Sequence, residues 1–156
     1  MSTIIGVFDD KSDAENSVED IKNAGITDDK ISIVAKEDQV SENENQEDNQ
    51  DLTAGATTGG TLGGLAGLMA GAGALTIPGI GPVVAAGPIA AGLSGVAAGG
   101  LTGSLVDMGV DQERGQYYED EVKSGAILAT VEADQAKIND VASYMRRNGA
   151  RDVETH

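Results

Sequence analysis

Few side chains in this sequence of 156 residues could perform catalysis. It has no cysteine, and its one histidine, His156, is the last residue, at a terminus that we expect to fray. Because these residue types supply many nucleophiles, general bases and zinc ligands, their scarcity argues against thiol chemistry, hydrolytic triads and the usual zinc centres. Carboxylate pairs are easy to find among 26 acidic residues and indicate nothing specific. We expect no enzyme, no catalytic residue, no metal site and no cofactor.

Glycines and acidic residues form patterns that could bind ligands. The glycine-rich tract suggests a phosphate loop, but no glycine precedes a lysine and no G-x-G-x-x-G occurs, so no small-molecule substrate is indicated. The acids of residues 42–51 could collect Ca²⁺ or Mg²⁺, yet they lack the central glycine and terminal Glu of an EF-hand. A solvated spacer is the favoured interpretation. The alternative function left open is a small-ligand or divalent-metal-binding regulatory module with the glycine-rich part as scaffold.

The tyrosine–acid cluster at residues 117–121 is a second tempting ligand patch. On an amphipathic helix, the expected arrangement is one tyrosine packed under the sheet and the acids facing water.

Glycine spacing is the most specific pattern in the chain. Small residues recur at intervals of four in two runs: Gly55, Gly59, Gly63, Gly67 and Gly71, then Gly87, Ala91, Gly95, Gly99 and Gly103. On a helix, this spacing leaves a ridge without large side chains, along which another backbone can approach closely. Two prolines and two glycines in residues 77–82 are typical of a reversal. The pattern predicts a glycine-zipper antiparallel helical hairpin, with helices over roughly 53–76 and 83–106 and with Pro88 either kinking or beginning the second.

Such helices need an external partner, because each interior glycine costs about 0.5–1 kcal/mol relative to alanine. A bilayer would stabilise the helix, because each backbone amide in lipid needs a hydrogen-bond partner within the chain. A close-packed interface with other helices would also stabilise it. The length suits a membrane span, and residues 52–106 contain no ionisable side chain. The flanking Asp51 and Asp107 are acidic, however, and neither basic anchors nor an aromatic belt is present. Membrane association and self-association into a homo-oligomer both stay open.

Net charge limits the other partners. A formal charge of −16 argues against nucleic acid, which needs a basic face, and against adsorption to anionic lipid. Residues 1–5 lack the basic and apolar regions of a secretory signal, so we expect a cytoplasmic protein, with any membrane association at the inner face.

Two β-α-β patterns flank the glycine-rich part. Residues 3–8 and 30–35 are β-branched runs around a helical pattern made by Ala14, Val18 and Ile21. Strands over 125–131 and 151–155 likewise flank a helix over 134–147, and a further helix is expected over 111–124. The two halves predict an α+β fold, a ferredoxin-like split βαβ sandwich of four strands with helices on one face. In this organisation, 1–35 and 109–156 are halves of one α+β domain, 36–51 is an acidic flexible linker, and 52–108 is the inserted hairpin.

The order of these pieces resembles a known family. The segments that carry the resemblance are VFDDKSDAENSVEDIKNAGITDDKISIVAKED, IPGIGPVVAAGPIAAGLSG and MGVDQERGQYYEDEVKSGAILATVEA. The chain thereby resembles bacterial general stress proteins of the heat-induced YflT-like type, which are also similar to cyanobacterial low-temperature-induced proteins. The resemblance implies a cytoplasmic, stress-associated protein and supplies no catalytic residue. We predict a non-enzymatic bacterial stress-response protein whose glycine-zipper hairpin mediates self-association or membrane association.

Overall fold

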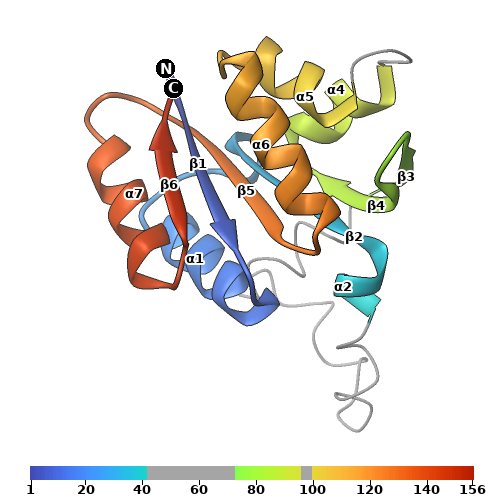
Figure 1. Cartoon of the computed structure of the whole chain (residues 1–156). Helices are drawn as coiled ribbons and strands as arrows, with labels where there is room; N and C mark the ends of the chain where they lie inside the picture. Colours follow the sequence, from blue (N-terminus) through green and yellow to red (C-terminus); the bar gives the residue numbers. More distant parts are fainter. Residues whose placement is uncertain (42–72, 96–99) are drawn as a thin grey trace, which may run out of the picture.

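The computed structural model describes residues 1–41, 73–95 and 100–156. Its six strands form one antiparallel sheet in the order β3-β4-β2-β5-β1-β6 (Figure 1). The predicted α+β class is therefore confirmed. The strands are β1 (Ser2–Phe8), β2 (Ile31–Lys36), β3 (Gly73–Ile77), β4 (Gly81–Ala86), β5 (Ile127–Ala133) and β6 (Asp152–Thr155). The helices are α1 (Lys11–Asn23), a 3-10 turn η1 (Asp28–Lys30), α2 (Glu37–Ser41), α4 (Pro88–Gly95), α5 (Gly100–Asp107), α6 (Gln112–Lys123) and α7 (Ile138–Arg147).

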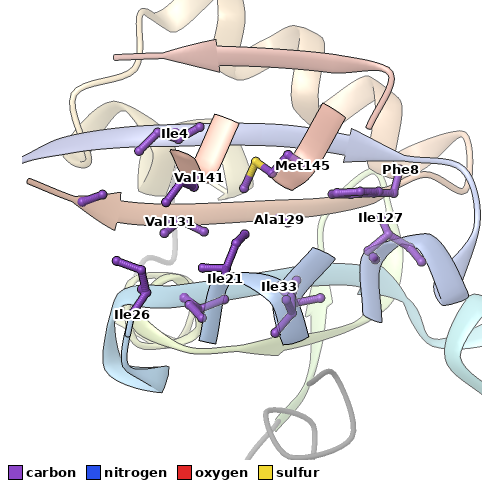
Figure 2. Close-up of a cluster of buried hydrophobic side chains, with 14 of the residues drawn as sticks. Ile4, Phe8, Ile21, Ile26, Ile33, Ile127, Ala129, Val131, Val141 and Met145 are labelled. Atoms are coloured by element: carbon purple, nitrogen blue, oxygen red, sulfur yellow. The ribbon is translucent and has the colours of Figure 1, made fainter. Parts of the chain in front are cut away.

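Helices cover both faces of the sheet. On one face, α1 and α7 pack against alternate side chains of β1, β2 and β5, and Figure 2 shows Ile21, Val141 and Met145 meeting the strands there. These side chains form the first core. On the other face, the remaining side chains of the same strands form the second core with α4, α5 and α6, in which Leu101 and Tyr118 are fully buried. The prediction of helices on one face only is wrong. The strands are continuous apolar runs, so they place hydrophobic side chains on both faces of the sheet. Both faces must therefore be covered by helices.

Residues 73–86 form a β-hairpin where the sequence predicted parts of two helices. The predicted reversal is present: Pro78 and Gly79 occupy a turn in which the Ile80 N–H donates to the Ile77 carbonyl at 3.1 Å. Gly79 has φ +88°, as the third residue of a type II turn requires. The helical prediction over 73–76 and 83–86 is wrong, since β4 pairs with β2 and gives that strand a second neighbour. Sheet pairing and the alternation of buried Val83 and Ala85 outweigh the small-residue spacing.

A single continuous helix over 83–106 is also incorrect. Pro88 is the first residue of α4, so it begins a helix rather than kinking one, as the second alternative held. Gly87 lies just before it with φ +81°, and a Cβ there would lie 2.0 Å from the carbonyl oxygen of Ile31. The Ser32 hydroxyl accepts a hydrogen bond from the Ile89 N–H at 3.2 Å and so caps α4 from β2. The close approach at Gly87 therefore fixes the start of α4 against the centre of the sheet.

The predicted domain boundaries change accordingly. The described parts of 52–108 are not a separate insertion, because β3 and β4 extend the sheet and α4 and α5 complete its second core. The predicted linker over 36–51 overlaps regular structure at its start, where Lys36 ends β2 and Glu37–Ser41 forms α2. Residues 42–51 of that linker and 53–72 of the first predicted helix lie outside the described residues.

Candidate functional site

The glycine ridge was the main site prediction, and most of it lies outside the described residues. That holds for Gly55, Gly59, Gly63, Gly67, Gly71 and Gly99. Ala91 and Gly95 belong to α4 and Gly103 to α5, while Gly87 precedes α4 in a non-helical conformation. A Cβ at Gly103 would meet no heavy atom of the described chain within 4 Å. Helix packing along the ridge therefore stays a prediction, because the described residues do not include the contacts that it needs.

Two other glycines mediate close helix contacts inside the structure. A Cβ at Gly92 in α4 would lie 3.2 Å from the Ser104 Oγ of α5. A Cβ at Gly115 in α6 would lie 3.1 Å from the Thr102 Cγ2, also of α5. Glu119 strengthens the second contact, since its Oε2 accepts from the Thr102 N–H at 2.9 Å and from the Thr102 hydroxyl. Glycine-mediated packing thus occurs within the α4-α5-α6 layer, at positions that the interval of four did not select.

Among the described residues, a group of ionisable side chains joined by hydrogen bonds and ion pairs lies between α6 and β6, and we call it the Arg114 cluster. It comprises Arg114, Tyr117 and Tyr118 of α6, Asp152 and Glu154 of β6, and His156. The guanidinium binds Glu154 with both arms, Nε to Oε2 at 2.8 Å and Nη2 to Oε1 at 2.7 Å. Nη2 also reaches Asp152 Oδ2 at 3.0 Å. Alternation along β6 places Asp152, Glu154 and His156 on one face, opposite Val153.

Burial and hydrogen bonding shift the pKa values of this cluster. The Tyr118 hydroxyl donates to Glu154 Oε2 at 3.1 Å, and burial raises the pKa of Tyr118 well above its ordinary value. Burial also raises the pKa of Tyr117, whose ring lies 4.4 Å from the Arg114 guanidinium carbon. Although burial opposes it, hydrogen bonding to Tyr118 and Asp152 raises the pKa of Arg114. These directions keep the tyrosines neutral and the arginine charged.

His156 is held in place by its backbone, so the expected fraying of the C-terminal residue is wrong. Its N–H donates to the Thr3 carbonyl at 2.8 Å, and its carbonyl accepts from the Thr3 N–H at 2.9 Å. The imidazole lies edge-on to Tyr118, with ring centroids 6.3 Å apart, and its buried Nε2 makes no hydrogen bond with a described residue. Glu154 Oε2 lies 3.5 Å from that nitrogen. The guanidinium, the two carboxylates and the Tyr118 hydroxyl bind one another rather than facing open space, so the cluster is a structural contact between α6 and β6. The His156 Nε2 is the exception.

Other candidate ligand sites are weak in the described residues. One tyrosine of the tyrosine–acid cluster is buried, as predicted, and it is Tyr118. Glu119 and Glu121, however, bind Thr102 and Arg151 instead of only facing water. No three His, Cys, Asp or Glu residues of the described chain are grouped to hold a metal ion. An open depression is lined by Lys36 at the end of β2, Glu37 and Asp38 of α2, Ile80 of the turn before β4, and Pro82 of β4. The acids of 42–51 lie outside the described residues.

The two edges of the sheet differ in charge. The edge strand β6 carries Asp152 and Glu154, and the Arg146 Nη2 donates to its Val153 carbonyl at 3.3 Å. The opposite edge strand, β3, has the sequence GALTI without a charged residue, and its first four residues are exposed or half-buried. Within residues 1–41, 73–95 and 100–156, no strand pairs with the outer side of β3. Charged and covered edges resist pairing with other chains, whereas uncharged ones favour it.

Among the described residues, no helix is both long and apolar enough to cross a membrane.

Comparison with known proteins identifies the family. The family model described as the heat induced stress protein YflT domain matches residues 3–82, from β1 into β4. Neither the curated proteins nor the solved structures include a match to this chain. Because the family match spans more than half of the 156 residues, this chain belongs to the heat-induced YflT stress protein family.

Proposed function

We propose that this chain is a non-enzymatic cytoplasmic stress-response protein whose uncharged, glycine-rich segment, residues 52–106, mediates self-association. Family membership supports the stress-response role and favours a function without catalysis. The observation that carries self-association is the segregation of charge. A chain of net charge −16 concentrates all its ionisable residues outside 52–106, and the described part of that segment supplies an exposed, uncharged sheet edge.

The ridge glycines remain our proposed packing residues within this segment. Close packing along Gly55–Gly71 would bring backbones together, and the acidic remainder of the chain would keep the assembly dispersed by mutual repulsion. For the α+β domain, we propose the ferredoxin-like assignment. The order β2-β5-β1-β6, with α1 and α7 as the two helical crossovers, supports it.

A matched pair of variants tests the ridge. Gly63→Leu places a large side chain on the ridge, whereas Gly64→Leu makes the same change one residue away, on another side of a helix. We expect Gly63→Leu to lower the oligomer mass measured by light scattering after size exclusion, and Gly64→Leu to preserve it. Far-ultraviolet circular dichroism checks that both variants fold alike. Equal masses for wild type and both variants would count against the ridge.

The alternatives are separated by two further measurements on the wild-type chain. Flotation with phosphatidylcholine vesicles would reveal membrane association, which would replace self-association as the role of the segment. A thermal-shift series with Ca²⁺, Mg²⁺ and nucleotides tests the ligand-binding alternative, since a specific ligand raises the melting temperature by mass action.

A further inference from the structure

We propose that β3 is a homodimerisation edge, which pairs antiparallel with β3 of a second copy of this chain about a two-fold axis at Leu75. The inference is independent of the ridge glycines, because it concerns backbone pairing within residues 73–77. It would make one continuous sheet through both copies.

The pairing of β3 with β4 determines which backbone groups are free. Thr76 lies opposite Pro82, which has no N–H, so these two residues cannot form a hydrogen-bonded pair. Hydrogen-bonded and non-hydrogen-bonded pairs alternate along an antiparallel ladder, so Leu75 bonds to Val83 while Ala74 and Thr76 direct their N–H and C=O groups outward. The outward groups of β3 therefore belong to Ala74 and Thr76.

This arrangement is self-complementary. When Leu75 of one copy lies opposite Leu75 of the other, Ala74 of each copy lies opposite Thr76 of the other and exchanges both backbone hydrogen bonds with it. Among two-fold registers confined to residues 73–77, this one uses all the outward groups. Leu75 is half-buried and packs against the second core, so the Leu75 pair would extend that core across the axis.

The uncharged edge favours a second copy as the occupant, despite the repulsion between two acidic chains. A basic partner would be attracted to the acidic surface of the chain and gains nothing at a neutral edge. A neutral edge suits another neutral edge, and the chain itself offers one on every copy. The opposite edge is protected by its acids and by Arg146, so association is directed to β3. A five-residue edge is short for a stable interface, so the dimer should be concentration-dependent.

Two copies of charge −16 repel each other, so the dimer should show a characteristic dependence on salt concentration. Salt screens this repulsion, so the dimer fraction at fixed protein concentration should rise with added NaCl. Association with a basic molecule would weaken with salt instead.

Thr76→Pro is the decisive variant. Proline removes only an outward N–H there and is tolerated on a free strand edge, so the monomer should fold. By symmetry, the dimer loses two hydrogen bonds, and its dissociation constant should rise by about tenfold or more. Thr76→Lys should weaken the dimer too, while Thr155→Lys, the same change on the exposed outer part of β6, should leave it unchanged.

Sedimentation equilibrium over a concentration series, at low salt and at high salt, measures these constants. All variants are also made with Gly63→Leu, so that loss of ridge packing and loss of β3 pairing are read separately. A dimer unaffected by Thr76→Pro, or disrupted only by Thr155→Lys, would overturn the proposal. So would a wild-type chain that stays monomeric while the Ala74 and Thr76 amides resist hydrogen exchange, because a segment of the same chain would then occupy the edge.

Discussion

Replacing Gly87 with alanine separates the observed fold from the helical hairpin that the glycine spacing predicts. In a helix interior, Gly87→Ala would stabilise the protein by about 0.5–1 kcal/mol. In the structure, Gly87 has φ +81° and the new Cβ would lie 2.0 Å from the Ile31 carbonyl oxygen and 2.8 Å from the Ser32 Cα. Both atoms belong to the backbone of β2, a strand in the interior of the sheet, and cannot rotate away. The two hypotheses therefore predict effects of opposite sign.

The size of the effect can be estimated from its parts. A left-handed conformation costs an alanine about 1–2 kcal/mol. Relief of the contact with β2 adds about 1–3 kcal/mol, the usual cost of overpacking. We expect Gly87→Ala to lower the free energy of unfolding by about 2–5 kcal/mol, a large share of the stability of an ordinary domain.

Gly79→Ala is the matched control. Gly79 also has a positive φ, +88°, but a Cβ there would meet nothing within 4 Å. It should cost only the conformational part, about 1–2 kcal/mol. Urea denaturation followed by circular dichroism measures both variants, and the difference between them isolates the contact with β2. If Gly87→Ala proves as stable as the wild type, or no less stable than Gly79→Ala, the described placement of Gly87 is wrong.

Two further predictions concern buried polar groups. Ser32→Ala leaves the Ile89 N–H without its acceptor and should cost about 1–2 kcal/mol in urea denaturation, whereas Ser17→Ala removes a buried hydroxyl that makes no hydrogen bond with a described residue and should be neutral or stabilising. Because burial raises the pKa of Tyr118, its contribution to stability is complete below pH ~10 and is lost as pH rises further, by up to about 1.4 kcal/mol per pH unit. Tyr118→Phe should therefore flatten the alkaline fall in unfolding free energy measured between pH 9 and 11. An unchanged slope would contradict the assignment.

The terminal elements could be predicted from local patterns alone. The helical spacing of Val18 and Ile21 in α1, and of Val141 and Met145 in α7, corresponds to the buried faces of those helices. Each helix has one neighbouring layer, so its apolar face is recorded directly in its sequence. The flanking strands are equally visible, because β-branched residues fill them and every second side chain enters the same core.

The β-hairpin could not be predicted in the same way. Residues 73–86 contain no charged side chain and mix glycine and alanine with larger apolar residues, so neither an interval of two nor an interval of four stands out. Their conformation is decided by β2, because the side of β2 that does not pair with β5 pairs with β4. The paired residues are far apart in the chain, so no local pattern indicates this contact. The Arg114 cluster depends on an even longer connection, from α6 to β6. Its one local signal is the alternation of Asp152, Glu154 and His156, which indicates a strand with a polar face.

The sheet order shows that the region matched by the family model is shorter than the part of the chain that folds as one unit. The match ends at residue 82, yet β1 and β2 within it are not neighbours, because β5 lies between them and pairs with both. Ile4 and Ile31 each lie opposite Val131, so the first core cannot close until residues far beyond the matched region have been added. The matched region also contains the neutral edge β3 and lacks the charged edge β6. The C-terminal residues therefore do two things for the family domain: they complete its core, and they leave β3 as the edge without charge.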